Sequence, residues 1–293
     1  MSLEPPYIIS CSRRTDIAAF YSPWFVNRVR AGWCEWRNPF GGRVQRVSLR
    51  PEDVLAIVFW TRHAAPLLPH LEWLSGEGYR FYFLVTINGY PRPIETHAPP
   101  LERAVDVFRR LSDAISPRLT HWRYDPIVLS DLTPVEYHLR RFEELSARLE
   151  GFTRRCYFSF VDYYGKTRRN LARLQPVQFR DPEPEVKTGL TSQLADIAQA
   201  RNITLYSCCE PGLAGGRIEP AHCVDAGLIG AALKPAPTRP GCGCAASTDI
   251  GAYDTCAFGC RYCYATSSRE TALGRMRAHD SSSPLLHEPR QNR

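Results

Sequence analysis

The sequence predicts an α/β protein, a partial (β/α)6 barrel of the TIM type followed by a cysteine-rich segment near its C-terminus. Two observations lead to this fold class. Six short apolar runs, rich in β-branched and aromatic residues, alternate with stretches of helical periodicity. Such alternation favours a parallel sheet, and strands that are apolar throughout suit a sheet covered on both faces, or a barrel. A doubly wound sheet is the alternative.

The elements follow in a regular order. Strands are predicted at residues 7–11, 56–61, 79–87, 120–129, 155–161 and 203–208. Helices are predicted at about 22–31, 64–76, 100–115, 133–149 and 190–201, with a weaker helical stretch at 221–233. Three regions are expected from this pattern: the barrel at 1–234, the cysteine-rich segment on its mouth at 235–271, and a polar tail at 272–293 that is predicted to be disordered.

Composition places this chain among soluble cytoplasmic proteins. It has 293 residues, 44% of them hydrophobic, which is enough for one large core. No run of 18 apolar residues is present, so no membrane span is expected, and the N-terminus lacks the features of a secretory signal. We therefore expect the cytoplasm, where thiols stay reduced. The net charge is +7, but its arginines are scattered, so nucleic-acid binding is not expected from charge alone.

Polar side chains follow the predicted strands. Reactive groups of β/α barrels gather where the strands end. Arg13, Arg14 and Asp16 follow the first strand, and Arg123 and Asp125 lie in the fourth. Any one of them alone would be an ordinary polar loop residue, and arginine and aspartate side chains can pair with each other without binding a ligand. Together, at one predicted face, they indicate a binding site for a cofactor or an anionic substrate.

Three of the eleven cysteines form a C-x3-C-x2-C motif at Cys256, Cys260 and Cys263. Three thiolates can hold three irons of a [4Fe–4S] cluster and leave the fourth iron open. Gly259 lets the loop turn tightly, and Tyr262 can lie against an adenine ring. The motif resembles that of the radical S-adenosylmethionine (SAM) superfamily. The resemblance implies reductive SAM cleavage, hydrogen abstraction from a substrate, and an electron donor such as a flavodoxin or ferredoxin.

The chain order differs from that superfamily, in which the cysteine loop follows the first strand of a (β/α)6 barrel. Here the loop follows all six predicted strands, so the cluster would reach the barrel mouth from the C-terminal side. No Gly-Gly-Glu stretch is present. A four-cysteine zinc site completed by Cys242 or Cys244 is the alternative for the motif.

Further cysteines predict a second site. Its candidate ligands are Cys208, Cys223, Cys242 and Cys244. They could hold an auxiliary [4Fe–4S] cluster or a structural zinc ion. The alternative is that Cys208 and Cys209 are small buried residues of the core and bind no metal.

Several segments together resemble one bacterial family. They are SRRTDIAAFY, VFWTR, WRYDPI, SFVDYY, YSCCE and CGCAASTDIGAYDTCAFGCRYCYA. The family is catalogued as domain of unknown function eighteen-forty-eight, and the resemblance spans about residues 6 to 268. It implies that Cys256, Cys260 and Cys263 bind the cluster. The family's C-x-E pattern maps to Cys208 and Glu210.

Three functions are compatible with these observations. The first is a radical SAM-like enzyme acting on an unknown small molecule. The second is a non-catalytic or redox β/α barrel with structural zinc or a fully ligated cluster. The third is a DNA-repair enzyme, because some relatives carry a photolyase label through similarity to spore photoproduct lyase.

Overall fold

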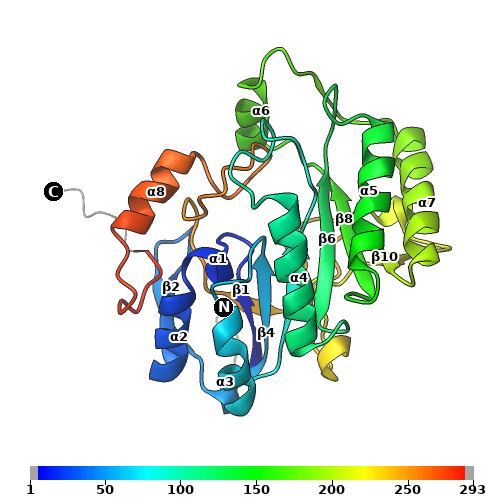
Figure 1. Ribbon diagram of the computed structural model, residues 1–293. Coiled ribbons are helices and arrows are strands. Elements are labelled where there is room, and N and C mark those ends of the chain that lie inside the picture. The colour runs from blue at the N-terminus through cyan, green and yellow to red at the C-terminus, as the bar shows by residue number, and fades with distance from the viewer. Residues whose placement is uncertain (1–5, 288–293) are drawn as a thin grey trace.

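The computed structural model describes residues 6–287 and centres on one parallel sheet (Figure 1). The sheet has eight strands in the order β11-β10-β8-β6-β5-β4-β1-β12. Their bounds are β1 Tyr7–Cys11, β4 Val54–Thr61, β5 Phe81–Thr86, β6 Thr120–Ile127, β8 Arg155–Phe160, β10 Thr204–Ser207, β11 Ile218–Pro220 and β12 Ser247–Asp249. All six predicted strands are therefore confirmed, and they lie side by side in chain order.

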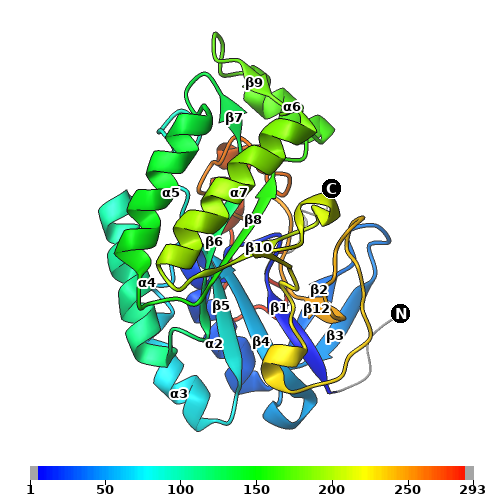
Figure 2. The same cartoon turned by 90° about the vertical axis from the view of Figure 1, so that its right-hand side faces the viewer.

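The strand β12 was not predicted, and it takes the edge of the sheet beside β1 (Figure 2). The two strands run parallel, with Ile8 opposite Ser247 and Ser10 opposite Asp249. Ser247, Thr248 and Asp249 form a stretch too short and too polar to predict a strand. Their extended conformation comes from pairing with β1. The last strand in the sequence is consequently next to the first in space.

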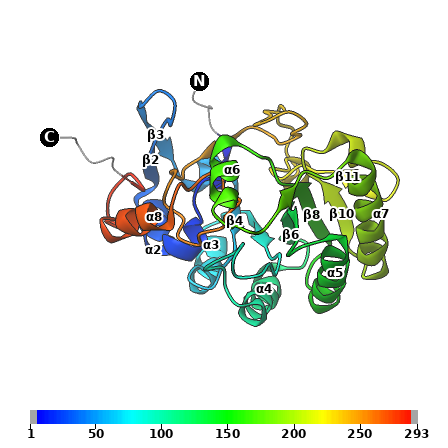
Figure 3. The ribbon, with the colours of Figure 1, turned by 90° about the horizontal axis from the view of Figure 1, so that it is seen from above.

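Helices cover one face of the sheet, as Figure 3 shows for α3, α4, α5 and α7. Their bounds, with that of α2, are α2 Ser22–Ala31, α3 Leu71–Gly76, α4 Leu101–Ile115, α5 Val135–Leu149 and α7 Pro184–Ala200. Aromatic side chains fill the space between the layers. Phe59 stacks on Phe83 at 4.6 Å between ring centroids, and Trp122 stacks on Phe142 at 4.7 Å. The five stronger predicted helices are confirmed, although α3 begins later and α7 begins earlier than expected.

The opposite face of the sheet is covered by coil. On this face, which we call the inward face, side chains such as Val58, Tyr82 and Tyr157 pack against residues 221–245. The Tyr82 hydroxyl donates to the Cys223 carbonyl at 3.0 Å and accepts from the Asp225 N–H at 2.9 Å. The weak helix predicted at 221–233 is wrong, since this stretch forms only a single 3-10 turn, Gly227–Ile229. Two glycines in the stretch disfavour a longer helix.

Smaller elements complete the described chain. They are α1 Ile17–Phe20, β2 Trp33–Arg37, β3 Val44–Ser48, β7 Leu129–Ser130, α6 Gly165–Ala172, β9 Phe179–Arg180, α8 Arg269–Arg277 and the 3-10 turns Pro51–Asp53, Leu68–His70 and Pro211–Leu213. Strands β2 and β3 form an antiparallel hairpin, and β7 pairs with β9 in an antiparallel ladder. None of the helices in the part of the chain that the structure describes is long and apolar enough to cross a membrane.

The prediction of a disordered tail from residue 272 is wrong for residues 272–287. The Trp24 indole donates to the Ser283 carbonyl at 2.8 Å, and the Glu35 N–H donates to the Pro284 carbonyl at 2.9 Å. Leu286 is 3% exposed and belongs to the main core. A few apolar side chains are thus enough to fix this polar stretch on the domain. Residues 288–293 lie outside the described residues.

Candidate functional site

Asp249, at the end of β12, joins the cysteine motif to the first strand. Its carboxylate accepts hydrogen bonds from the Ser12 hydroxyl at 2.8 Å, the Arg13 N–H at 2.8 Å and the Arg14 guanidinium at 3.0 Å. Burial alone would raise the pKa of Asp249, but Arg14 and these donors lower it below its usual range. The carboxylate is therefore held ionised, and Arg14 has a structural partner instead of facing a ligand.

The loop after β12 packs tightly on the loop after β1. The Thr15 and Thr255 hydroxyls lie 2.6 Å apart, and the Tyr21 hydroxyl donates to the Thr255 carbonyl at 2.9 Å. Gly251 is needed at this contact, because a Cβ atom there would lie 2.0 Å from the Ser12 Oγ. The motif thus lies at the carboxyl end of β1, the face where the predicted site residues were expected.

The motif thiols, Cys256, Cys260 and Cys263, follow within this loop. Burial raises the pKa of Cys256, and Asp16 and the two other motif thiols raise it further. Burial also raises the pKa of Cys260, to about 12, although Arg62 opposes the shift. Both thiols are therefore protonated in the free protein, and metal binding would have to release their protons. Gly259 has φ +69°, which confirms its expected role in the turn.

Tyr262 is buried, and a polar network surrounds its hydroxyl. The hydroxyl donates to the Glu95 carboxylate, and it accepts from Arg62 and from the Asn88 amide, the latter at 3.1 Å. Arg62 also forms a 2.8 Å ion pair with Glu95. Sequence reasoning missed Glu95. Arg62 and Asn88 directly follow the strands predicted at 56–61 and 79–87, and this position is their only signal in the sequence. This network fixes the motif loop; the contact of Tyr262 with adenine remains a prediction.

Asp16 has two structural partners and lies close to a motif thiol. Its carboxylate caps α1 by accepting from the Ala19 N–H at 3.0 Å, and accepts from the Arg62 N–H at 2.7 Å. Burial raises the pKa of Asp16 to about 6, and Asp16 in turn raises that of Cys256. The structure thus brings Asp16, but not Arg14, next to the motif thiols.

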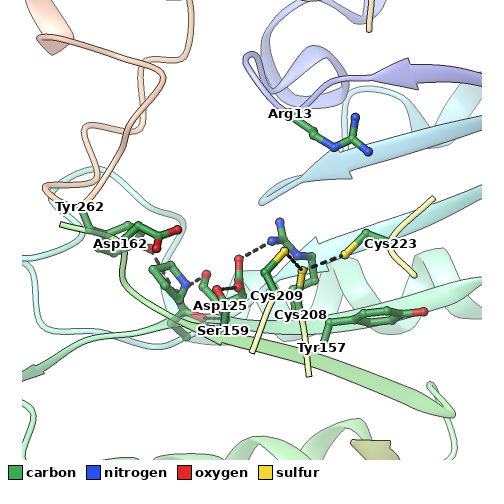
Figure 4. Close-up of polar contacts among 12 residues, drawn as sticks. Arg13, Asp125, Tyr157, Ser159, Asp162, Cys208, Cys209, Cys223 and Tyr262 are labelled. Atoms are coloured by element: carbon green, nitrogen blue, oxygen red, sulfur yellow. Dashed lines mark hydrogen bonds and ion pairs between the residues drawn. The ribbon is translucent and has the colours of Figure 1, made fainter. Parts of the chain in front are cut away.

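A second group, the inner thiols, lies on the inward face of the sheet. It consists of Cys208, Cys209, Cys223, Cys242 and Cys244. The Cys208 sulfur lies 3.4 Å from that of Cys223 and 3.8 Å from that of Cys209 (Figure 4). Further thiol interactions link Cys223 to Cys244, and Cys242 to both Cys209 and Cys244. The four predicted residues are therefore brought together, with Cys209 as a fifth member.

Two arginines lie beside the inner thiols, on the indole of Trp60. The guanidinium carbon of Arg13 is 4.9 Å from the indole centroid, and that of Arg123 is 5.1 Å from it. Arg123 pairs with Asp125, which also accepts from the Ser159 hydroxyl at 2.5 Å. Burial disfavours the charged form of both arginines, but their neighbours raise their pKa values. Asp125 and then Cys223 raise the pKa of Arg123, and Cys244 and Asp249 raise that of Arg13.

The arginines also have unused donors. The Arg13 Nη2 and Arg123 Nε atoms are buried without a hydrogen-bond partner among the described residues. Both could donate to thiolate sulfur. Glu210, by contrast, accepts from the Phe160 N–H at 3.2 Å, and burial raises its pKa. Its carboxylate thus lies at the end of β8, and within residues 6–287 it forms no hydrogen bond to a thiol.

Neither thiol group is arranged as a finished metal site. As the side chains stand, no set of three or more His, Cys, Asp or Glu residues between residues 6 and 287 could hold a metal ion. All eleven cysteines are free thiols within this range. The donor chemistry suits a soft metal, since thiolate sulfur is the ligand of zinc and of iron–sulfur clusters.

The fold and the site define an α/β protein in which two groups of thiols lie at a parallel sheet, one at its carboxyl edge and one on its inward face. The chain belongs to the family described as Domain of unknown function (DUF1848), whose model matches residues 8–265. The expected family resemblance is thereby confirmed. Among curated proteins, none matches the chain.

Proposed function

We propose that the protein is a radical SAM-like enzyme that binds a [4Fe–4S] cluster at Cys256, Cys260 and Cys263. The observation that carries the proposal is the position of β12. It pairs in parallel with β1, and the motif loop leaves its carboxyl end beside the loop that follows β1. A motif that comes last in the chain therefore occupies the space next to the first strand.

The strand order supports a partial (β/α)6 barrel as the finer description of the fold. Six strands that are consecutive in the chain are neighbours in the sheet, all parallel. Helices lie on one face, and the inner thiols and the coil that carries them lie on the other. In barrels of this kind, reacting groups gather at the carboxyl ends of the strands, which is where the motif thiols lie.

The residues around the motif have separable roles in this proposal. The motif thiols would hold three irons, and the bound cluster would supply the electron for SAM cleavage. Arg62 lies near Cys260 and would offset the negative charge of bound thiolates. Glu95, Asn88 and the Tyr262 hydroxyl hold the loop in place. Arg13, Arg123 and Asp125 are then available for SAM, for substrate, or for the inner thiols.

The inner thiols favour a single tetrahedral ion such as zinc over a second cluster. Four thiolates about 2.3 Å from one zinc ion lie about 3.8 Å from one another. The sulfur of Cys208 lies 3.4 Å from that of Cys223 and 3.8 Å from that of Cys209, and both distances are close to this value. Ligands of a cubic cluster bind different irons and lie farther apart. Small side-chain rotations toward a common centre would complete the site. The second candidate function is accordingly that of a β/α barrel that binds structural zinc and performs no radical chemistry.

Formation of 5′-deoxyadenosine tests the proposal. The protein is reconstituted with iron and sulfide without oxygen, reduced and given SAM. We expect 5′-deoxyadenosine and brown colour from the wild type and from Cys34→Ala, a buried cysteine outside both thiol groups. Cys260→Ala should lose both. Product formation by Cys260→Ala at the wild-type level would refute the proposal, and zinc without iron–sulfur absorbance would support the second candidate.

A further inference from the structure

A pocket lies beside the motif loop, and residues of both α6 and α8 line it. Three parts of the chain that are far apart in the sequence line it. They contribute Thr96 and His97, Asn170 and Arg173, residues 259–261 and residues 266–270. The pocket touches Cys260 but none of the inner thiols.

The pocket is strongly basic. Arg173, Arg261 and Arg269 line it together with His97, against one acidic residue, Glu270. None of the ion pairs formed within residues 6–287 involves these three arginines. Their charges are therefore not offset by salt bridges inside the described protein. Burial lowers the pKa of His97, and Arg269 and Arg261 lower it further, which agrees with an excess of positive charge.

Hydrogen-bond donors in the pocket also lack partners. The Arg261 Nε and the Thr96 Oγ1 are buried and unpaired among the described residues. Leaving such groups unsatisfied costs free energy, so a ligand that accepts from them would be stabilised. The hydroxyls of Thr266 and Ser267 also line the pocket, but they already donate to the Cys256 carbonyl and the Asp254 carboxylate. These unpaired donors and arginine charges would be satisfied by a negatively charged ligand that accepts several hydrogen bonds.

We infer that this pocket binds the phosphate group of a small-molecule substrate. A phosphate presents several anionic oxygens in different directions, which matches guanidinium and hydroxyl donors that converge from separate segments. The inference rests on the proposed function, because contact with Cys260 would hold the phosphorylated substrate beside the cluster. Its substrate class is accordingly a phosphate monoester.

Calorimetric titration of the full chain in phosphate-free buffer tests this inference. The probes are inorganic phosphate and phenyl phosphate, a monoester. We expect both to bind, and each of Arg173→Gln and Arg261→Gln to weaken binding about tenfold, the equivalent of one charge-assisted hydrogen bond. Arg173 is exposed, so its substitution should not impair folding. Arg43→Gln, an equal change of charge at an exposed position outside the pocket, should leave binding unchanged.

Several results would overturn the inference. They are absence of binding, equal weakening by Arg43→Gln, or binding of inorganic phosphate without the monoester. Saturating SAM on the reconstituted protein should not displace the probes, and displacement would assign the pocket to the SAM carboxylate. Phosphate binding needs no SAM cleavage, so its failure is distinguishable from failure of the proposed enzyme activity.

Discussion

Arg14 and Asp249 are 235 residues apart in the sequence, yet their side chains form an ion pair of 3.0 Å. Both side chains are largely buried, at 10% and 16% exposure. The pair fastens the loop after β1 to the strand that precedes the cysteine motif. Its loss should therefore affect both the stability of the fold and the position of the motif.

Asp249→Asn should lower the free energy of unfolding by about 3 kcal/mol, because it leaves the buried Arg14 charge without its partner. Urea unfolding followed by circular dichroism measures the change. Asp106→Asn is the matched control. Asp106 pairs with Arg110 at 3.8 Å with both side chains more than 60% exposed, so its loss should cost under about 0.5 kcal/mol. Equal effects of the two substitutions would contradict the structural role of Asp249.

Gly251→Ala should disturb the contact between the two loops. The added Cβ would lie 2.0 Å from the Ser12 Oγ and 2.6 Å from its Cβ, so one of the loops must move. We expect destabilisation of about 1–3 kcal/mol and a lower yield of reconstituted cluster. Gly274→Ala, inside α8 with nothing within 4 Å of the new Cβ, should be neutral or slightly stabilising. A Gly251→Ala protein with wild-type stability and iron content would exclude this close approach.

Metal analysis should separate the two thiol groups. In protein purified before any iron treatment, we expect about one zinc ion per chain at the inner thiols. Cys223→Ser should lose this zinc, whereas Cys156→Ala, a buried cysteine of β8, should keep it. Cys260→Ala should also keep the zinc, because it belongs to the motif thiols. Zinc retained by Cys223→Ser would show that the inner thiols are not its ligands.

Stability should fall as the pH is lowered from 6.5 to about 4. Burial lowers the pKa of His138 to about 4, although the contact of its Nε2 with the Val128 carbonyl opposes the shift. The unfolded chain binds a proton at a pKa of about 6.5, and the folded protein resists it, so acid favours unfolding. This linkage amounts to about 3 kcal/mol over the interval.

Urea titrations at pH 6.5 and 4.5 check this dependence. Between these two pH values His138→Gln should lose about 2 kcal/mol less stability than the wild type. His121, whose pKa burial also lowers to about 4, acts in the same direction, whereas Asp16 acts in the opposite one. A His138→Gln slope identical to that of the wild type would show that His138 is not neutral in the fold.

Local patterns predicted the strands and helices well, because long apolar runs are buried wherever the chain places them. The six predicted strands are all present. The edge strand β12 and the tail could not be predicted, since polar residues there depend on partners more than 200 residues away, such as Ser10 and Trp24. The separation of the cysteines indicated two groups, but only the fold shows that Cys209 joins the inner one.

For the site residues, too, contacts with partners that are distant in the sequence could not be predicted. The sequence suggested a cofactor or substrate site for Arg13, Arg14 and Arg123. The structure places Arg13 and Arg123 beside the inner thiols and pairs Arg14 with Asp249. Asp249 itself is a single acidic residue in a polar stretch, and nothing local marks it. Glu95 lies in a loop between a strand and a helix, so its contact with Tyr262 is visible only in three dimensions.

The pairing of β12 with β1 has a consequence for synthesis on the ribosome. The first strand emerges more than 230 residues before its edge partner, roughly 12 to 50 seconds at ordinary elongation rates. During that interval the sheet can form with its β1 edge unpaired, and the motif cysteines have not yet been made. Any cofactor at the motif can consequently be loaded only after nearly the whole sheet has been synthesised.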